Sequence, residues 1–174
     1  MKSIFKYLTI ILCITLVVGC GTKQKEDKLP TNLVETMDLE TTGATMVCSV
    51  EFDYSDTKGY TTGSLFAVYA DDQGIVTKVV SREMVASNDD DILALFEDSL
   101  NRNYDAISQY GGYTYKVEIE GNVLTSNVTI DYTETDLKTM ATENEDLKMY
   151  LNENNQLTLE KIKAMYVSSG VECN

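Results

Sequence analysis

The sequence predicts an α+β fold, in which a mainly antiparallel sheet carries helices on one face. Three observations lead to this prediction. Some stretches alternate apolar and polar residues with the period of a strand, others have the apolar spacing of an amphipathic helix, and most connections are short enough for antiparallel neighbours. The predicted order is three strands, a helix, two strands and a helix (β-β-β-α-β-β-α).

The first three strands are predicted at 46–54, 60–70 and 75–84. The first of them alternates clearly, which places Cys48 on its inner face. Each of the other two follows a short run that contains Asp and Gly, which are typical turn residues. These segments therefore predict an antiparallel meander.

A long helix is expected after the run Ser87-Asn88-Asp89-Asp90-Asp91. Ser, Asn and Asp side chains can accept hydrogen bonds from the free amides of a first helical turn, and acidic residues suit the positive end of a helix. The buried stripe of this helix is predicted to consist of Ile92, Leu95, Phe96, Leu100, Tyr104 and Ile107.

A hairpin and a second helix complete the predicted domain. The hairpin turns at Gly121-Asn122, and the inner face of its second strand is interrupted by Ser126. Residues 133–155 give no clear pattern beyond a helical turn at 136–140. The last helix is expected to begin after Thr158 and to end at Gly170, shortly before Cys173.

The first 19 residues have the pattern of a signal peptide. Lys2 and Lys6 precede an apolar run at 8–18, which is shorter than the roughly 20 residues that cross a bilayer. Leu16-Val17-Val18-Gly19-Cys20 resembles the lipobox of bacterial lipoproteins, so lipidation of Cys20 is expected. The alternative is an ordinary signal peptide with a chance cysteine. The lipobox predicts a protein anchored in the cell membrane by lipid and facing the extracytoplasmic side.

Two further regions follow the predicted cleavage site. Residues 20–43 are polar and contain the one proline, so they are expected to form the lipidated N-terminus and a flexible tether. Residues 44–174 are expected to form a single α+β domain. The formal net charge of −14 disfavours binding to nucleic acid, so the expected partners are the membrane, through the lipid, and an unknown protein or envelope ligand.

Two of the four cysteines remain available after export and lipidation. Cys13 leaves with the signal peptide and Cys20 carries the lipid, which leaves Cys48 and Cys173. An even pair in an oxidising compartment is expected to form a disulfide. Two free thiols or a soft-metal site are the alternatives, although the chain has no histidine and no CxxC pair to favour a metal.

Five segments follow one another in a characteristic order. They are the lipobox, the cysteine strand at 46–50, the Val-Thr-Lys-Val strand at 76–79, the Tyr-Lys-Val-Glu-Ile strand at 115–119, and Gly-x-x-Cys at 170–173. Taken in this order, they resemble the YehR-like small bacterial lipoproteins. The resemblance implies the α+β fold and a Cys48–Cys173 disulfide. It implies no activity and no catalytic residues.

Catalytic signatures are missing from the sequence. The absence of histidine removes the usual general base and the commonest zinc ligand, and no phosphate-binding loop or nucleophile motif occurs. No cofactor or metal site is therefore predicted. The acidic runs at 71–72 and 89–91 lack the spacing of a calcium loop, and turn and cap roles explain them better.

The chain contains 11 tyrosines and no tryptophan. Exposed tyrosines can stack on sugars or anchor a protein partner. Those expected to face the core are Tyr54, Tyr113, Tyr115, Tyr132 and Tyr166. Those that remain as candidates for ligand contact are Tyr60, Tyr69, Tyr110 and Tyr150.

The leading functional hypothesis is a non-enzymatic binding or interaction domain with an unknown ligand. It expects an exposed aromatic patch or a concave pocket. A carboxylate-dependent hydrolase of envelope polymers is the first alternative, and it requires two acids that face each other across a cleft. A passive structural lipoprotein of the envelope is the second.

Overall fold

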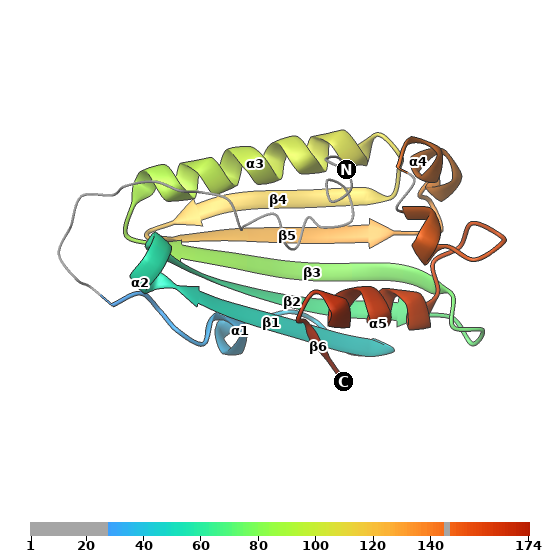
Figure 1. Cartoon of the computed structure of the whole chain (residues 1–174), viewed down its shortest axis with the longest axis horizontal. Helices are drawn as coiled ribbons and strands as arrows, with labels where there is room; N and C mark the ends of the chain where they lie inside the picture. Colours follow the sequence, from blue (N-terminus) through green and yellow to red (C-terminus); the bar gives the residue numbers. More distant parts are fainter. Residues whose placement is uncertain (1–27, 145–146) are drawn as a thin grey trace.

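The computed structural model describes residues 28–144 and 147–174, which form an α+β domain around one antiparallel sheet (Figure 1). The strand order in the sheet is β4-β5-β3-β2-β1-β6, and every pair of neighbours is antiparallel. The strands are β1 (Met46–Tyr54), β2 (Tyr60–Ala70), β3 (Val76–Ser87), β4 (Tyr113–Glu120), β5 (Val123–Asp131) and β6 (Glu172–Cys173).

The helices are more numerous than predicted. They are α1 (Leu33–Thr36), α2 (Ser55–Lys58), α3 (Asp90–Ser108), α4 (Leu137–Glu143), the 3-10 helix η2 (Leu147–Tyr150) and α5 (Leu159–Ser168). The fold class and the antiparallel sheet are confirmed. The predicted element order is incomplete, because it lacks the short helices and the C-terminal strand β6.

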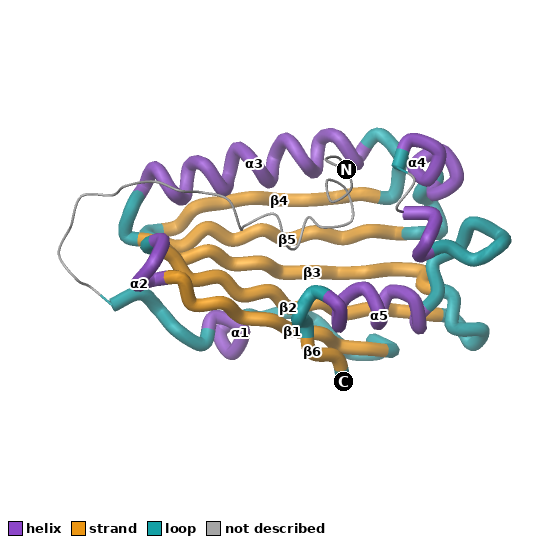
Figure 2. The backbone as a smooth tube through the Cα atoms, in the orientation of Figure 1, coloured by secondary structure: helices purple, strands orange, loops and turns teal. Residues whose placement is uncertain are grey.

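The two longest helices, α3 and α5, pack on the same face of the sheet (Figure 2). Their buried side chains form one core with the inward residues of the strands. Phe66 of β2 stacks on Tyr166 of α5, with ring centroids 5.1 Å apart. At the other end of the core, Tyr60 meets Phe96 of α3 edge-on at 5.2 Å.

The buried stripe of α3 differs from the prediction at its first turn. Leu93, Phe96, Leu100, Tyr104 and Ile107 are buried, whereas Ile92 is half-buried and Leu95 is 41% exposed. Leu93 lies three residues before Phe96 and seven before Leu100, so it continues the 3.6-residue period. Leu95 falls outside that period, and its place in the predicted stripe is therefore wrong.

The prediction of helices on one face alone is also wrong, because α1 packs on the opposite face. Leu33 and Met37 form a second apolar cluster there with Ala86 of β3. Glu51 of β1 holds this segment by accepting hydrogen bonds from the backbone amides of Asn32 and Val34, at 2.6 and 3.2 Å.

The flexible tether predicted at 20–43 therefore needs correction. Residues 28–43 belong to the folded domain, in which Leu29, Leu33 and Met37 are all less than 10% exposed. The physical reason is the outer face of the sheet, which presents Leu65, Met84 and Val123 for these side chains to cover. Residues 20–27 lie outside the described part of the chain.

The acidic runs occupy turns and helix caps, as predicted. Asp71 accepts hydrogen bonds from the amides of Gln73 and Ile75 in the β2–β3 turn, both at 2.9 Å. Asp89 is the N-cap of α3 and accepts from the amide of Asp91 at 2.9 Å. Each of these aspartates thus has a local backbone role.

The predicted disulfide is confirmed. Cys48 of β1 and Cys173 of β6 are paired directly in register and joined through their sulfurs. The bond fastens the C-terminal strand, which immediately follows α5, to the edge of the sheet.

No helix in the described residues is both long and apolar enough to pass through a bilayer. The predicted signal peptide and Cys20 lie outside the residues that the structure describes.

Candidate functional site

A row of polar residues crosses the core face of the sheet. Glu83 of β3 is paired in register with Ser64 of β2 on one side and with Ser126 of β5 on the other. All three side chains are buried, and Glu83 is only 5% exposed. Because an isolated acid is costly to bury, a carboxyl at this position requires a specific reason.

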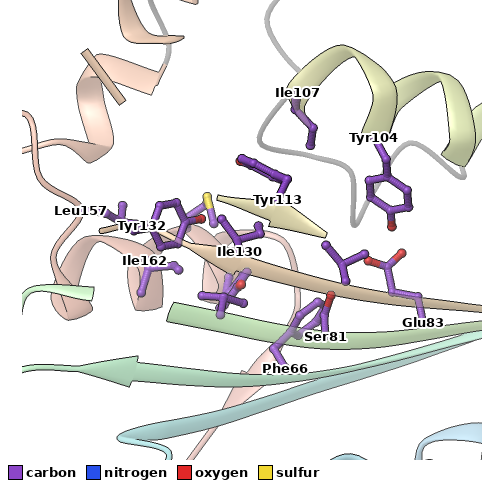
Figure 3. A pocket seen from close by; sticks show the side chains of 14 residues that line it. Phe66, Ser81, Glu83, Tyr104, Ile107, Tyr113, Ile130, Tyr132, Leu157 and Ile162 are labelled. Atoms are coloured by element: carbon purple, nitrogen blue, oxygen red, sulfur yellow. The ribbon is translucent and has the colours of Figure 1, made fainter. Parts of the chain in front are cut away.

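Tyr104 of α3 supplies the hydrogen-bond partner of this row. Its hydroxyl lies 3.0 Å from Oγ of Ser126 and is also hydrogen-bonded to the carboxyl of Glu83. In Figure 3, Tyr104 points from the helix toward Glu83 on the sheet. Helix α3 and two strands are thus linked through three buried polar side chains.

Burial is the main cause of the raised pKa of the Glu83 carboxyl. Loss of solvation raises the pKa of its carboxyl to about 8, and the hydrogen bond from Tyr104 opposes only part of that rise. In the unliganded protein the side chain is therefore mostly a neutral acid near pH 7.

A cavity lies beside this row, between the sheet and the two long helices (Figure 3). Its volume is about 60 Å³, which is room for roughly four water molecules. The lining residues are Phe66, Val79, Ser81, Glu83, Tyr104, Ile107, Tyr113, Val128, Ile130, Tyr132, Leu157, Ile162, Met165 and Tyr166.

The cavity has a buried floor and a half-buried rim. Glu83, Tyr104 and Tyr166 belong to the floor, whereas Tyr113 and Tyr132 are half-buried. Burial raises the pKa of each of the four tyrosines well above its usual value, so their hydroxyls stay protonated. They contribute aromatic rings and neutral hydroxyl groups to the lining.

The lining has a distinct chemical character. Among the described residues that line the cavity, Glu83 is the one acid, and no Lys or Arg is present. The other polar groups are the tyrosine hydroxyls and Ser81. The described residues also include no group of three or more acidic or cysteine side chains arranged for a metal ion.

The four tyrosines predicted to contact a ligand are not brought together. Tyr60 is 1% exposed and belongs to the core. Tyr69 lies at the opposite end of β2, where Lys78 sits 4.1 Å from its ring centroid. Tyr110 donates a hydrogen bond to Glu143 at 2.6 Å, and Tyr150 packs against the core from η2.

The cavity tyrosines come instead from the group that was expected to face the core, together with Tyr104 of the helix stripe. Tyr113, Tyr132 and Tyr166 do face inward, but they surround a space that they do not fill. Glu83 was missed entirely. The sequence signal that pointed to it was Ser126, a polar residue on the otherwise apolar inner face of β5. Ser126 is the direct neighbour of Glu83 in the register of the sheet.

Comparisons with known proteins identify no family. No family model matches the chain, and no curated protein matches it. An NMR structure of a protein from Streptococcus pneumoniae TIGR4 is 16% identical, with 90% of this chain and 100% of that chain covered and a TM-score of 0.40. A score at this level does not establish a common fold. Because none of these comparisons identifies a family, the resemblance to YehR-like lipoproteins stays a prediction. The function of the site therefore has to be argued from its own residues.

Proposed function

We propose that this protein is a lipid-anchored, extracytoplasmic binding domain that holds a small ligand in the cavity between the sheet and helices α3 and α5. The observation that carries the proposal is the cavity itself, in which a buried carboxyl, four tyrosines and Ser81 line an otherwise apolar space. Pockets of small ligands combine apolar walls with a few polar groups in the same way.

The placement of Glu83 supports a binding role over a purely structural one. A core that served packing alone gains nothing from a carboxyl with a pKa near 8, since an apolar residue of similar size removes the cost of desolvation. A ligand that pairs with the carboxyl recovers part of that cost. The envelope-structural alternative leaves the residue unexplained.

The hydrolase alternative has less support. It requires two acids on opposite sides of a cleft, whereas the lining of this cavity, within the described residues, includes only Glu83. We therefore base the proposal on binding.

Ligand-observed NMR with a library of small fragments tests the binding role. Ser81 lies on the cavity wall between Phe66 and Val128, so Ser81→Leu fills the space. Val80→Leu adds apolar volume to the adjacent residue on the other face of β3 and is the matched control. We expect some fragments to bind the wild type and the control but not Ser81→Leu. If no fragment distinguishes the two variants, the cavity is not a binding site.

The anchor is tested separately. The lipobox at Cys20 predicts that labelled palmitate enters the protein and that the protein fractionates with membranes. Cys20→Ala is expected to abolish both results. Unchanged labelling and fractionation of this variant would refute the lipoprotein assignment without affecting the cavity.

A further inference from the structure

We infer that the cavity recognises a small organic ammonium ion, with Glu83 as its counter-ion and the tyrosine rings as its walls. This inference rests on the proposed binding function and names the chemical class of the ligand. The structure contributes three observations, which are the charge of the lining, the aromatic walls and the location of the acid.

The lining selects by charge. An anion would enter a space in which the described residues supply one acid and no Lys or Arg, so no opposite charge there compensates its lost hydration. A cation meets a carboxyl on the floor. The chain also carries a formal net charge of −14, which raises the concentration of cations near its surface.

The walls suit an alkylated ammonium group in particular. The negative faces of aromatic rings attract such cations, and aromatic cages are the usual recognition site of quaternary ammonium groups. Phe66 and Tyr166 stack at 5.1 Å on one side of the cavity, and Tyr104 enters from the other helix. Tyr113 and Tyr132 add two rings at the half-buried rim.

The buried acid couples binding to a proton. The titratable groups that line the cavity with Glu83 are Tyr104 from α3, Tyr113 from β4, Tyr132 after β5 and Tyr166 from α5. All four tyrosines remain neutral, so the carboxyl is the group that changes charge. An ammonium ion binds the ionised carboxyl, and its binding therefore releases the proton of Glu83.

Three probes of nearly equal shape separate charge from size. They are choline, its neutral carbon isostere dimethylbutanol, and the carboxylate dimethylbutanoate. Calorimetric titration of the full-length protein, purified in a non-ionic detergent, is expected to give at least tenfold tighter binding of choline than of dimethylbutanol and no binding of dimethylbutanoate. The affinity for choline is expected to rise from about pH 7 to about pH 9, whereas that for dimethylbutanol stays constant.

Two variants then test whether Glu83, on the floor of the cavity, causes the preference for choline over dimethylbutanol. Glu83→Gln keeps the size and hydrogen bonding of the side chain and is expected to reduce choline binding to the level of dimethylbutanol. The matched control is Glu118→Gln, because Glu118 is an exposed acid on β4 that pairs with Lys116 at the surface. It is expected to leave choline binding unchanged.

The outcomes distinguish this inference from the proposed function. Equal binding of choline and dimethylbutanol, or a preference for choline that survives Glu83→Gln, overturns the ammonium assignment and leaves the binding cavity in place. If none of the three probes binds, while fragments still bind the wild type and not Ser81→Leu, the ammonium assignment is likewise overturned and the binding cavity stands. Failure of the probes and of every fragment removes both proposals.

Discussion

Cys48 and Cys173 face each other across the β1–β6 pair, with their Cα atoms 4.1 Å apart and a sequence separation of 125 residues. Their disulfide attaches β6 to the sheet, and β6 directly follows α5. Because α5 contributes Ile162, Met165 and Tyr166 to the cavity, the bond also supports one wall of the candidate site.

Removing this disulfide is expected to destabilise the fold. Chain entropy for a loop of this length corresponds to about 5 kcal/mol, and measured losses for native disulfides are about 2–5 kcal/mol. Urea unfolding of Cys48→Ser/Cys173→Ser should show a lower midpoint than the wild type, and the wild type in reductant should match the variant. Identical midpoints with and without reductant would show that the bond does not contribute to stability.

Glu83 is expected to make stability fall as the pH rises. Its carboxyl has a pKa of about 8 in the fold, against a usual value of 4.5. Between these values the folded state binds more protons than the unfolded state, so each pH unit removes up to about 1.4 kcal/mol of unfolding free energy. The contribution of the protonated Glu83 carboxyl to the unfolding free energy is fully present below pH 4.5 and is lost above pH 8.

The variant Glu83→Gln isolates this effect, because a neutral amide does not titrate. The difference in unfolding free energy between Glu83→Gln and the wild type should move in favour of the variant between about pH 5 and about pH 8. The surface variant Glu118→Gln should show no such trend. A constant difference for Glu83→Gln across this range would mean that the carboxyl ionises at a similar pH in both states.

The strands were the part of the fold that the sequence predicted best. Alternation at 46–54 and 113–119 matches β1 and β4 closely. β1 lies near one edge of the sheet and β4 is the other edge, and the outward residues of both strands are less buried than those that face the core. Prediction was weaker for β3, a central strand with buried residues on both faces. Ser81 and Glu83 point inward there, while Val80 and Met84 lie on the other face.

The N-terminal segment and the cavity were missed for different reasons. Leu29, Leu33 and Met37 recur every four residues, but only the outer face of the sheet explains why three apolar residues in a polar stretch become buried. The cavity depends on how closely α3 and α5 approach each other on the sheet. That distance follows from tertiary packing, and no local pattern encodes it.

Tyr104→Phe tests the buried hydrogen-bond row. The change removes the hydroxyl that contacts both Glu83 and Ser126, and a buried polar group that loses its partner costs about 1–3 kcal/mol. Tyr115→Phe is the matched control, since its hydroxyl donates to Asp105 at 2.5 Å on the exposed side of α3. Urea unfolding should show a clear loss for the first variant and a small one for the second. Equal losses would indicate that the row contributes no more than a surface contact.

Gly63 tests whether residues 28–37 truly belong to the domain. A Cβ atom at this position would lie 2.9 Å from Cβ of Leu33 and 3.2 Å from the terminal methyl of Met37. Gly63→Ala should therefore displace the segment and cost about 1–3 kcal/mol, as overpacking does in other cores. In a chain that begins at Asp38 these contact atoms are absent, so the same substitution should be neutral or stabilising there. An equal effect in the long and the short chain would show that the segment does not rest on the sheet.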